Sequence, residues 1–318
     1  MKQSRHNLRR SVTAAFVFLM CGGFSRAQTL PDQYSKPPHT AQNVRADAAS
    51  YEFDYVFKDH RGAKRRWKWS YPRAAADMMR QKYGIVPGSL NKYNTYSYSS
   101  EEEKELKKQE ALSNKVRILR EGLFNLIKIK DEYIMKSDFE QVVNFFMPFT
   151  VPIYYLIESS LYGKEPAFTE RIALALAFCQ DIPYGIPPGI YQQREINGQF
   201  SPIDTLLNKY GDCDSKVALF GAILAHYPEY ELLGIYTTEF SHALMAIAGT
   251  PQGDQKYLNL QGKKFLYCEP VGNARTPFGY FHEENGKPLV VTTIAITQNR
   301  AKLQNEMWRK MVTSEILP

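Results

Sequence analysis

A cysteine stands between two aspartates where a helix is expected to begin. Asp212 is a suitable N-cap, and apolar residues follow Cys213 at helical spacing. The N–H groups and positive dipole end of the first turn then face the Cys213 sulfur and favour its thiolate. That dipole contributes only about 1 kcal/mol. Because the carboxylates of Asp212 and Asp214 oppose a further negative charge, the thiolate also needs a cationic partner.

Histidine is the side chain that supplies such a charge near neutral pH. His39 lies in a lead-in segment, His60 in a predicted hairpin turn, and His226 near the far end of the helix that carries the sulfur. His242 instead begins an apolar run that is typical of a core strand, and a ring at a strand's edge can reach a helix terminus. We therefore expect His242 to be the catalytic base.

A second strand is expected over residues 265–269. Strand alternation places Phe265, Tyr267 and Glu269 on one face and Cys268 on the other. If Glu269 meets His242, it orients the ring and stabilises its cation, and Cys268 points away. Nucleophile, base and orienting carboxylate together make the arrangement that acyl transfer requires.

The other cysteines are weaker nucleophile candidates. Cys179 lies near the C-terminal end of its expected helix, where the negative dipole end raises a thiol pKa. Cys179 and Cys268 are either buried thiols or partners in a disulfide, and the sequence leaves both readings open. Cys213, His242 and Cys268 could also bind a metal, but strand alternation opposes this. We expect no metal and no cofactor.

Three motifs in this order resemble the bacterial transglutaminase-like cysteine peptidase superfamily. They are Gly-Asp-Cys-Asp at residues 211–214, Ser-His-Ala-Leu-Met-Ala-Ile at 241–247, and Phe-Leu-Tyr-Cys-Glu-Pro-Val-Gly at 265–272. Residues 178–184 and 201–207 also resemble segments that precede the nucleophile in that family, so the likeness covers about residues 168–275. In this chain the third member is Glu269, where Asp is commoner, and Pro270 follows it.

The resemblance implies an α+β fold with a papain-like, transglutaminase-like core, in which an antiparallel sheet packs on the nucleophile helix. It also implies thiol acyl transfer on amide bonds of a protein, peptide or cell-envelope substrate. Release of the acyl group to water would make the protein a peptidase or amidase, and release to an amine a transglutaminase. The N–H of Cys213 is the first oxyanion donor, with the Gln180 amide and the Tyr184 hydroxyl as supplementary candidates.

A non-catalytic envelope-binding module on the same fold is the alternative function. The chain's 21 tyrosines, many of them at residues 91–98 and in the first hairpin, are typical of a binding surface. Replacement of Cys213 by alanine would abolish the effect of an enzyme and spare that of a binding module.

The basic charge of the chain is concentrated at its start. The formal net charge is +7, yet residues 28–318 hold 35 basic and 33 acidic residues, so the body does not predict a nucleic-acid partner. Residues 1–27 combine basic residues, the uncharged run 11–25 and a Ser-Arg-Ala end, which is typical of a secretory signal peptide. We expect cleavage after Ala27, a periplasmic or secreted protein, and no membrane span in the mature chain. An uncleaved anchor or a lipidated Cys21 is the alternative.

The remaining chain predicts a mixed N-terminal extension and a catalytic domain. Residues 28–50 have no period and predict a flexible lead-in, residues 51–160 a hairpin plus helical region, and residues 161–318 the transglutaminase-like domain. The aromatic row of the hairpin is interpreted as a core-facing sheet surface, with sugar or peptide binding as the alternative.

The run 142–157 holds two prolines and predicts a buried or groove-lining segment, with an interfacial membrane segment as the alternative. Other expected elements are a hairpin at 51–58 and 64–71, helices at 74–83, 101–136, 169–180 and 301–312, a loop at 183–202, and a hairpin turning at Asn285-Gly286.

Overall fold

The computed structural model describes residues 10–13, 40–129, 132–161, 168–237, 242–272, 275–282, 286–297 and 312–317. The chain divides into two compact units. One comprises residues 1–26, 82–138 and 189–197, and the other, which contains all the candidate catalytic residues, comprises residues 27–81, 139–188 and 198–318. This division does not follow the predicted boundary near residue 160, because the aromatic hairpin belongs to the same unit as the candidate site.

A four-stranded antiparallel sheet in the order β15-β4-β3-β2 contains this hairpin. Its strands are β2 (Ala41–Ala46), β3 (Ser50–Lys58), β4 (Lys64–Pro72) and β15 (Val312–Leu317). Alternate side chains of β3 and β4 are buried, and their rings pack on Phe178 and Phe149. The aromatic row is therefore a core surface, and it is not exposed to grip a ligand.

A five-stranded antiparallel sheet in the order β12-β13-β11-β10-β14 carries the other candidate residues. Its strands are β10 (Leu232–Thr237), β11 (Ala243–Ala248), β12 (Tyr257–Leu260), β13 (Lys263–Cys268) and β14 (Pro288–Ile294). Met245 of β11 lies opposite Cys268 of β13. Phe265 and Tyr267 belong to a core cluster on one face, with Leu244 and Ala246 of the neighbouring strand, so Cys268 lies on the other face, as strand alternation predicted.

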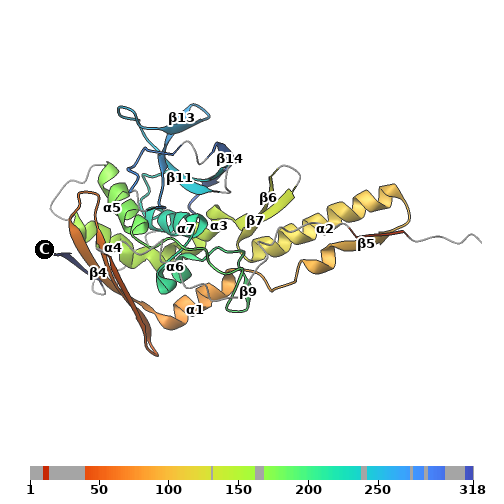
Figure 1. Ribbon diagram of the computed structural model, residues 1–318, viewed down its shortest axis with the longest axis horizontal. Coiled ribbons are helices and arrows are strands. Elements are labelled where there is room, and N and C mark those ends of the chain that lie inside the picture. The colour runs from red at the N-terminus through yellow and green to blue at the C-terminus, as the bar shows by residue number, and fades with distance from the viewer. Residues whose placement is uncertain are drawn as a thin grey trace, which may run out of the picture. The chain divides into compact units, whose positions relative to one another are not determined.

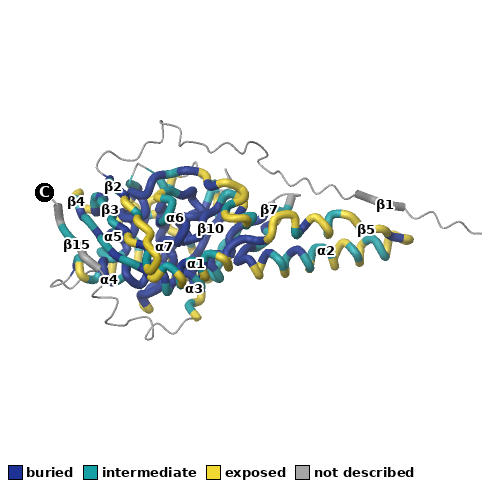
Figure 2. The backbone as a smooth tube through the Cα atoms, turned by 90° about the horizontal axis from the view of Figure 1, so that it is seen from below, coloured by how far each residue is buried: buried dark blue, intermediate teal, exposed yellow. Residues whose placement is uncertain are grey.

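Helix α7 (Cys213–Leu224) lies at the centre of this unit, and all its residues are buried (Figures 1 and 2). It contacts β10 and β11 and the helices around it, which are α3 (Phe139–Phe146), η3 (Met147–Thr150), α4 (Val151–Ser160), α5 (Phe168–Gln180) and α6 (Pro202–Asn208). A β-carbon on Gly221 would lie 2.6 Å from Met245 Cε, so α7 approaches the sheet very closely. The α+β class and an antiparallel sheet packed on the helix of Cys213 are thus confirmed.

The apolar run 142–157 forms α3, η3 and the start of α4, and most of its side chains are buried. Its prolines stand at the starts of η3 and α4, where they have no helical hydrogen bond to break. The prediction of a buried segment is confirmed. Among the described residues, no helix has the length and apolarity needed to cross a membrane.

The long helix expected over residues 101–136 is wrong in its second half. Helix α2 (Glu101–Glu121) ends at Gly122, and the hairpin β6 (Phe124–Ile129) and β7 (Glu132–Ser137) follows. A β-carbon on Gly122 would lie 2.5 Å from the Gly84 carbonyl oxygen, so this contact admits only glycine. Leu123 then adopts a φ of 68°, outside the right-handed helical region, and reverses the chain. The apolar residues keep a helical spacing on both sides of Gly122, which is why the sequence predicted one continuous helix.

Helix α2 and the hairpin of β6 and β7 belong to the unit of residues 1–26, 82–138 and 189–197. The other elements of that unit are β1 (Arg10–Thr13) paired with β5 (Thr95–Tyr98), η2 (Asn91–Tyr93), and the short hairpin β8 (Ile190–Tyr191) and β9 (Arg194–Glu195). This last hairpin lies within the predicted loop 183–202. Helix α1 (Arg73–Lys82) and α5 match the helices expected at 74–83 and 169–180.

Both ends of the chain differ from the elements expected there. Residues 41–46 of the predicted flexible lead-in form β2, because they pair with β3 along the sheet edge. Val312, the last residue of the predicted terminal helix, instead begins β15, while residues 301–311 of that helix lie outside the described residues. Most of the predicted signal peptide, with Cys21 and its cleavage site, also lies outside them, as does Asn285 of the predicted turn. The hairpin expected around that turn is wrong, because β14 pairs with β10 and residues 278–282 form no strand.

Candidate active site

The start of α7 places Cys213 at the first helical position. Asp212 adopts an extended conformation and its carboxylate accepts a 3.0 Å hydrogen bond from the Ser215 N–H, as an N-cap does. The Ser215 hydroxyl also hydrogen-bonds to Asp212, and it accepts from the N–H of Phe200 at 2.8 Å. The predicted cap is confirmed. Cys213 is buried, with 8% of its surface exposed.

His242 and Glu269 form the pair that strand alternation predicted. His242 Nε2 donates to Glu269 Oε2 at 2.7 Å, and the two side chains are 15% and 5% exposed. The pairing of Met245 with Cys268 puts Leu244 opposite Glu269, so His242 and Glu269 are diagonal neighbours on one face. Thr237 N–H donates to the His242 carbonyl at 2.9 Å and fixes the backbone before β11.

The start of α7 has two further interactions, one with the end of β13 and one with the segment after α5. Lys216, one turn after Cys213, is completely buried, and its charge interacts with that of Glu269. Tyr184 forms a parallel bridge with Gly211, where the Gly211 N–H donates to the Pro183 carbonyl at 3.2 Å. All three candidate residues belong to the same unit, and Lys216 relates the helix of Cys213 to Glu269 through its charge.

The two supplementary oxyanion candidates lie beside this region but differ in what they offer. Gln180 Nε2 donates to the carbonyls of Glu269 at 2.9 Å and of Thr276 at 2.8 Å. Both its hydrogens are therefore engaged, and Gln180 serves to hold the backbone of Glu269 in place. Tyr184, four residues after Gln180, is partly buried, and its backbone pairs with that of Gly211. The N–H of Cys213 stands at the first position of α7, where the positive end of the helix dipole lies.

The other two cysteines are placed as poor nucleophiles. No disulfide joins Cys179, Cys213 and Cys268. Burial raises the pKa of Cys179 to about 12 and that of Cys268 well above its ordinary value. Among the described residues, the one grouping of three metal-ligating side chains is Asp212, Cys213 and Asp214, so His242 and Cys268 do not join Cys213 in a ligand set.

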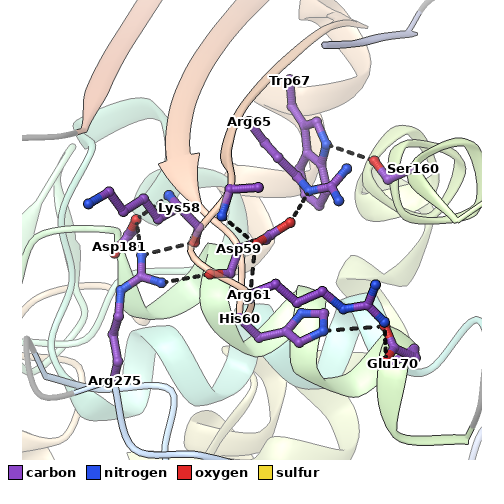
Figure 3. A network of polar contacts seen from close by, with 11 residues as sticks. Lys58, Asp59, His60, Arg61, Arg65, Trp67, Ser160, Glu170, Asp181 and Arg275 are labelled. Carbon is purple, nitrogen blue, oxygen red and sulfur yellow. Dashed lines mark hydrogen bonds and ion pairs between the residues drawn. The ribbon is translucent and has the colours of Figure 1, made fainter. Parts of the chain in front are cut away.

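A polar network joins the turn of the first hairpin to Asp181 and Arg275 (Figure 3). Asp181, which follows α5 and is 3% exposed, accepts from Arg275 at 2.5 Å and from the Lys58 N–H at 2.8 Å. Arg275 also donates to the carbonyls of Lys58 and Asp59 at the hairpin turn. Asp59 in turn pairs with Arg65 at 2.6 Å. The network ties the turn of the first hairpin to the segments that follow α5 and β13.

At the outer side of the same turn, Glu170 of α5 pairs with His60 at 3.3 Å and with Arg61 at 2.6 Å. The Trp67 indole N–H donates to the Ser160 hydroxyl at 3.2 Å. These contacts hold the hairpin against α4 and α5, which agrees with the exclusion of His60 from the candidate site (Figure 3).

Three residues of this region, Lys216, Asp181 and Arg275, were not among those predicted from the sequence. For Lys216 a signal was present, because it stands in a helix whose other residues are almost all apolar. A lysine in such a run is rare unless a partner neutralises it. Asp181 and Arg275 had no comparable signal, since they lie 94 positions apart and meet only through the fold.

Comparison with protein-family models, curated proteins and solved structures found no match to this chain.

Proposed function

We propose that the chain is a thiol acyl-transfer enzyme that acts on amide bonds, with Cys213 as nucleophile, His242 as general acid and base, and Glu269 as orienting carboxylate. The observation that carries the proposal is the 2.7 Å hydrogen bond from His242 Nε2 to Glu269. The capped start of α7, which carries Cys213, supports it. A papain-like, transglutaminase-like core is part of the same proposal.

The hydrogen bond to Glu269 supports separate roles for the two ring nitrogens of His242. Because Nε2 donates to Glu269, Nδ1 is the nitrogen that exchanges a proton with the Cys213 thiol. The carboxylate stabilises the imidazolium that forms when Nδ1 takes this proton. The N–H groups at the start of α7 stabilise the thiolate that results.

In the first half-reaction the Cys213 sulfur attacks the carbonyl carbon of the amide. The oxyanion that forms accepts a hydrogen bond from the Cys213 N–H. The imidazolium gives its Nδ1 proton to the amine, the C–N bond breaks, and the acyl group remains on sulfur as a thioester. In the second half, His242 takes a proton from water or from a second amine, which attacks the thioester and releases the thiolate.

The pH dependence of Cys213 alkylation tests the proposal. The full chain is treated with iodoacetamide between pH 5 and pH 9, and labelled peptides are mapped, with buried Cys179 and Cys268 as internal references. We expect Cys213 to react with a midpoint well below about 8.5, the value of an ordinary thiol. His242→Ala should return the midpoint to about 8.5, because the imidazolium no longer stabilises the thiolate.

His60→Ala is the matched control. His60 is also a partly buried histidine paired with a glutamate, but it lies at the hairpin turn, so its replacement should leave the Cys213 midpoint unchanged. A wild-type midpoint near 8.5 that His242→Ala does not move would refute the proposal.

The envelope-binding module without catalysis is the competing proposal. Burial of the first hairpin's aromatic row removes one of the surfaces on which that proposal depended. Cys213→Ala separates the two functions, since a binding module keeps its biological effect without the sulfur and an enzyme loses it.

A further inference from the structure

Ser215 is a serine in the interior of the protein, two residues after Cys213 on α7, with none of its surface exposed. Its hydroxyl takes part in two hydrogen bonds. It donates to the Asp212 carboxylate, and it accepts from the Phe200 N–H at 2.8 Å. These two bonds fix the direction of the hydroxyl, because its oxygen faces Phe200 and its hydrogen faces Asp212.

The Asp212 carboxylate therefore receives two donors from Ser215. The backbone N–H of Ser215 donates to Oδ1 at 3.0 Å, and the hydroxyl donates to the same oxygen. An N-cap requires the N–H alone, so the hydroxyl is an additional donor. The bond from Phe200 strengthens it, because a hydroxyl that accepts a hydrogen bond is a better donor. The turn before the cap is closely packed on Ser215, since a β-carbon on Gly211 would lie 2.9 Å from that of Ser215.

The same carboxylate lies beside the candidate nucleophile. Carboxylate oxygens of Asp212 and Asp214 and the Cys213 sulfur lie within 4.8 Å of one another. At such a distance a carboxylate charge raises the energy of a thiolate. The hydroxyl dipole of Ser215 presents its positive end to Asp212 and compensates part of this charge. Lys216 is a further group whose charge interacts with that of Asp212.

We infer that Ser215 is a positioning residue of the candidate active site, whose hydroxyl holds the Asp212 carboxylate at the helix cap and reduces its repulsion of the Cys213 thiolate. The inference rests on the proposed function and extends it to a fourth residue. Ser215 does not contact the substrate in this role. It acts through Asp212, so its effect on the sulfur depends on the charge of that residue.

The test is a double-mutant cycle of Ser215→Ala and Asp212→Asn, read out as the midpoint of Cys213 alkylation by iodoacetamide between pH 5 and pH 9. Ser215→Ala should raise the midpoint by about half a pKa unit, so alkylation below the midpoint slows about threefold. Asp212→Asn should lower the midpoint, because asparagine keeps the cap and removes the charge. In the Asp212→Asn background, Ser215→Ala should leave the midpoint unchanged.

Ser201→Ala is the matched control. Ser201 is also completely buried, and its hydroxyl donates at 2.7 Å to the carboxylate of Asp204, in the first turn of α6. Its replacement should leave the Cys213 midpoint unchanged. Circular dichroism verifies that each variant is folded, and sucrose, which favours the folded state, is added to all samples if one of them is partly unfolded.

An unchanged midpoint in Ser215→Ala would overturn the inference, as would an equal shift in Ser201→Ala. A shift by Ser215→Ala that is the same in both backgrounds would also overturn it, because a purely structural role in the cap predicts that result. If the wild-type midpoint does not depend on His242, the proposed function itself fails. If it does and Ser215→Ala reacts like the wild type, only the role of Ser215 fails.

Discussion

The burial of Lys216 predicts a specific pH dependence of stability. Its pKa is about 8 in the folded protein and 10.5 as the ordinary value, which the unfolded chain adopts. As the pH falls from 10.5 to 8, the unfolded chain takes up a proton that the folded protein does not yet bind. Stability is therefore lost over this interval, and below pH 8 the loss is complete and constant.

The magnitude follows from the difference between the two pKa values. At about 1.4 kcal/mol per pKa unit, the difference corresponds to about 3 kcal/mol of unfolding free energy. Tyrosines such as Tyr71, whose pKa burial raises to about 12, lower the stability of the folded protein at high pH and partly mask this change. The contribution of Lys216 is therefore measured as the difference between the wild type and Lys216→Met.

Urea denaturation of the two proteins at half-unit steps from pH 7 to pH 10.5 provides the assay. We expect the wild type to gain stability relative to Lys216→Met by about 3 kcal/mol across this range. Lys264→Met, which replaces an exposed lysine of β13, should keep a constant difference from the wild type. A constant difference for Lys216→Met as well would refute the placement of this ammonium in the interior.

Two further substitutions test the packing and the polar network. Gly221→Ala places a β-carbon 2.6 Å from Met245 Cε and 2.7 Å from Val143 Cγ2, so overpacking of about 1–3 kcal/mol should outweigh a helix-propensity gain of up to about 1 kcal/mol. Urea denaturation of Gly221→Ala should show a net loss of stability. Cys213 alkylation at neutral pH should slow, because the displaced α7 carries the sulfur. A Gly221→Ala variant more stable than the wild type would contradict this packing. Asp59→Asn leaves Arg65 buried without its anion and should cost about 3–5 kcal/mol. Burial raises the pKa of Asp59, but the Arg65 ion pair and backbone hydrogen bonds outweigh it, so the pKa is lowered overall. The wild type should therefore lose stability as the pH falls below about 4, and the variant should not. Equal acid sensitivity of the two proteins would contradict the ion pair.

Local rules were enough to predict the parts of the site that lie close together in sequence. The cap of α7 by Asp212 depends on residues three positions apart, and the shared face of His242 and Glu269 depends on strand alternation in two strands that are adjacent in the sheet. The buried hairpin and the segment 142–157 likewise follow from their own apolar patterns.

Local rules failed where a distant contact decided the outcome. The helix expected through residue 136 ends at its C-cap Gly122, which lies against the backbone of Gly84. The apolar spacing that continues past residue 122 outweighed this glycine in the prediction, and no pattern near it reveals Gly84. Residues 41–46 form a strand because β3 offers them an edge, although their own composition has no strand period.

What the sequence by itself determined is the chemistry available: a capped cysteine at a helix start, a histidine at the edge of a core strand, and a carboxylate on the strand beside it. Only the tertiary structure decided that Gln180 is occupied by backbone carbonyls, that Asp181 meets Arg275, and that Lys216 lies among anionic groups. The physical reason is that caps and strand faces depend on a few neighbouring backbone dihedrals. The environment of a buried charge depends instead on every segment packed around it, and these segments come from distant parts of the chain.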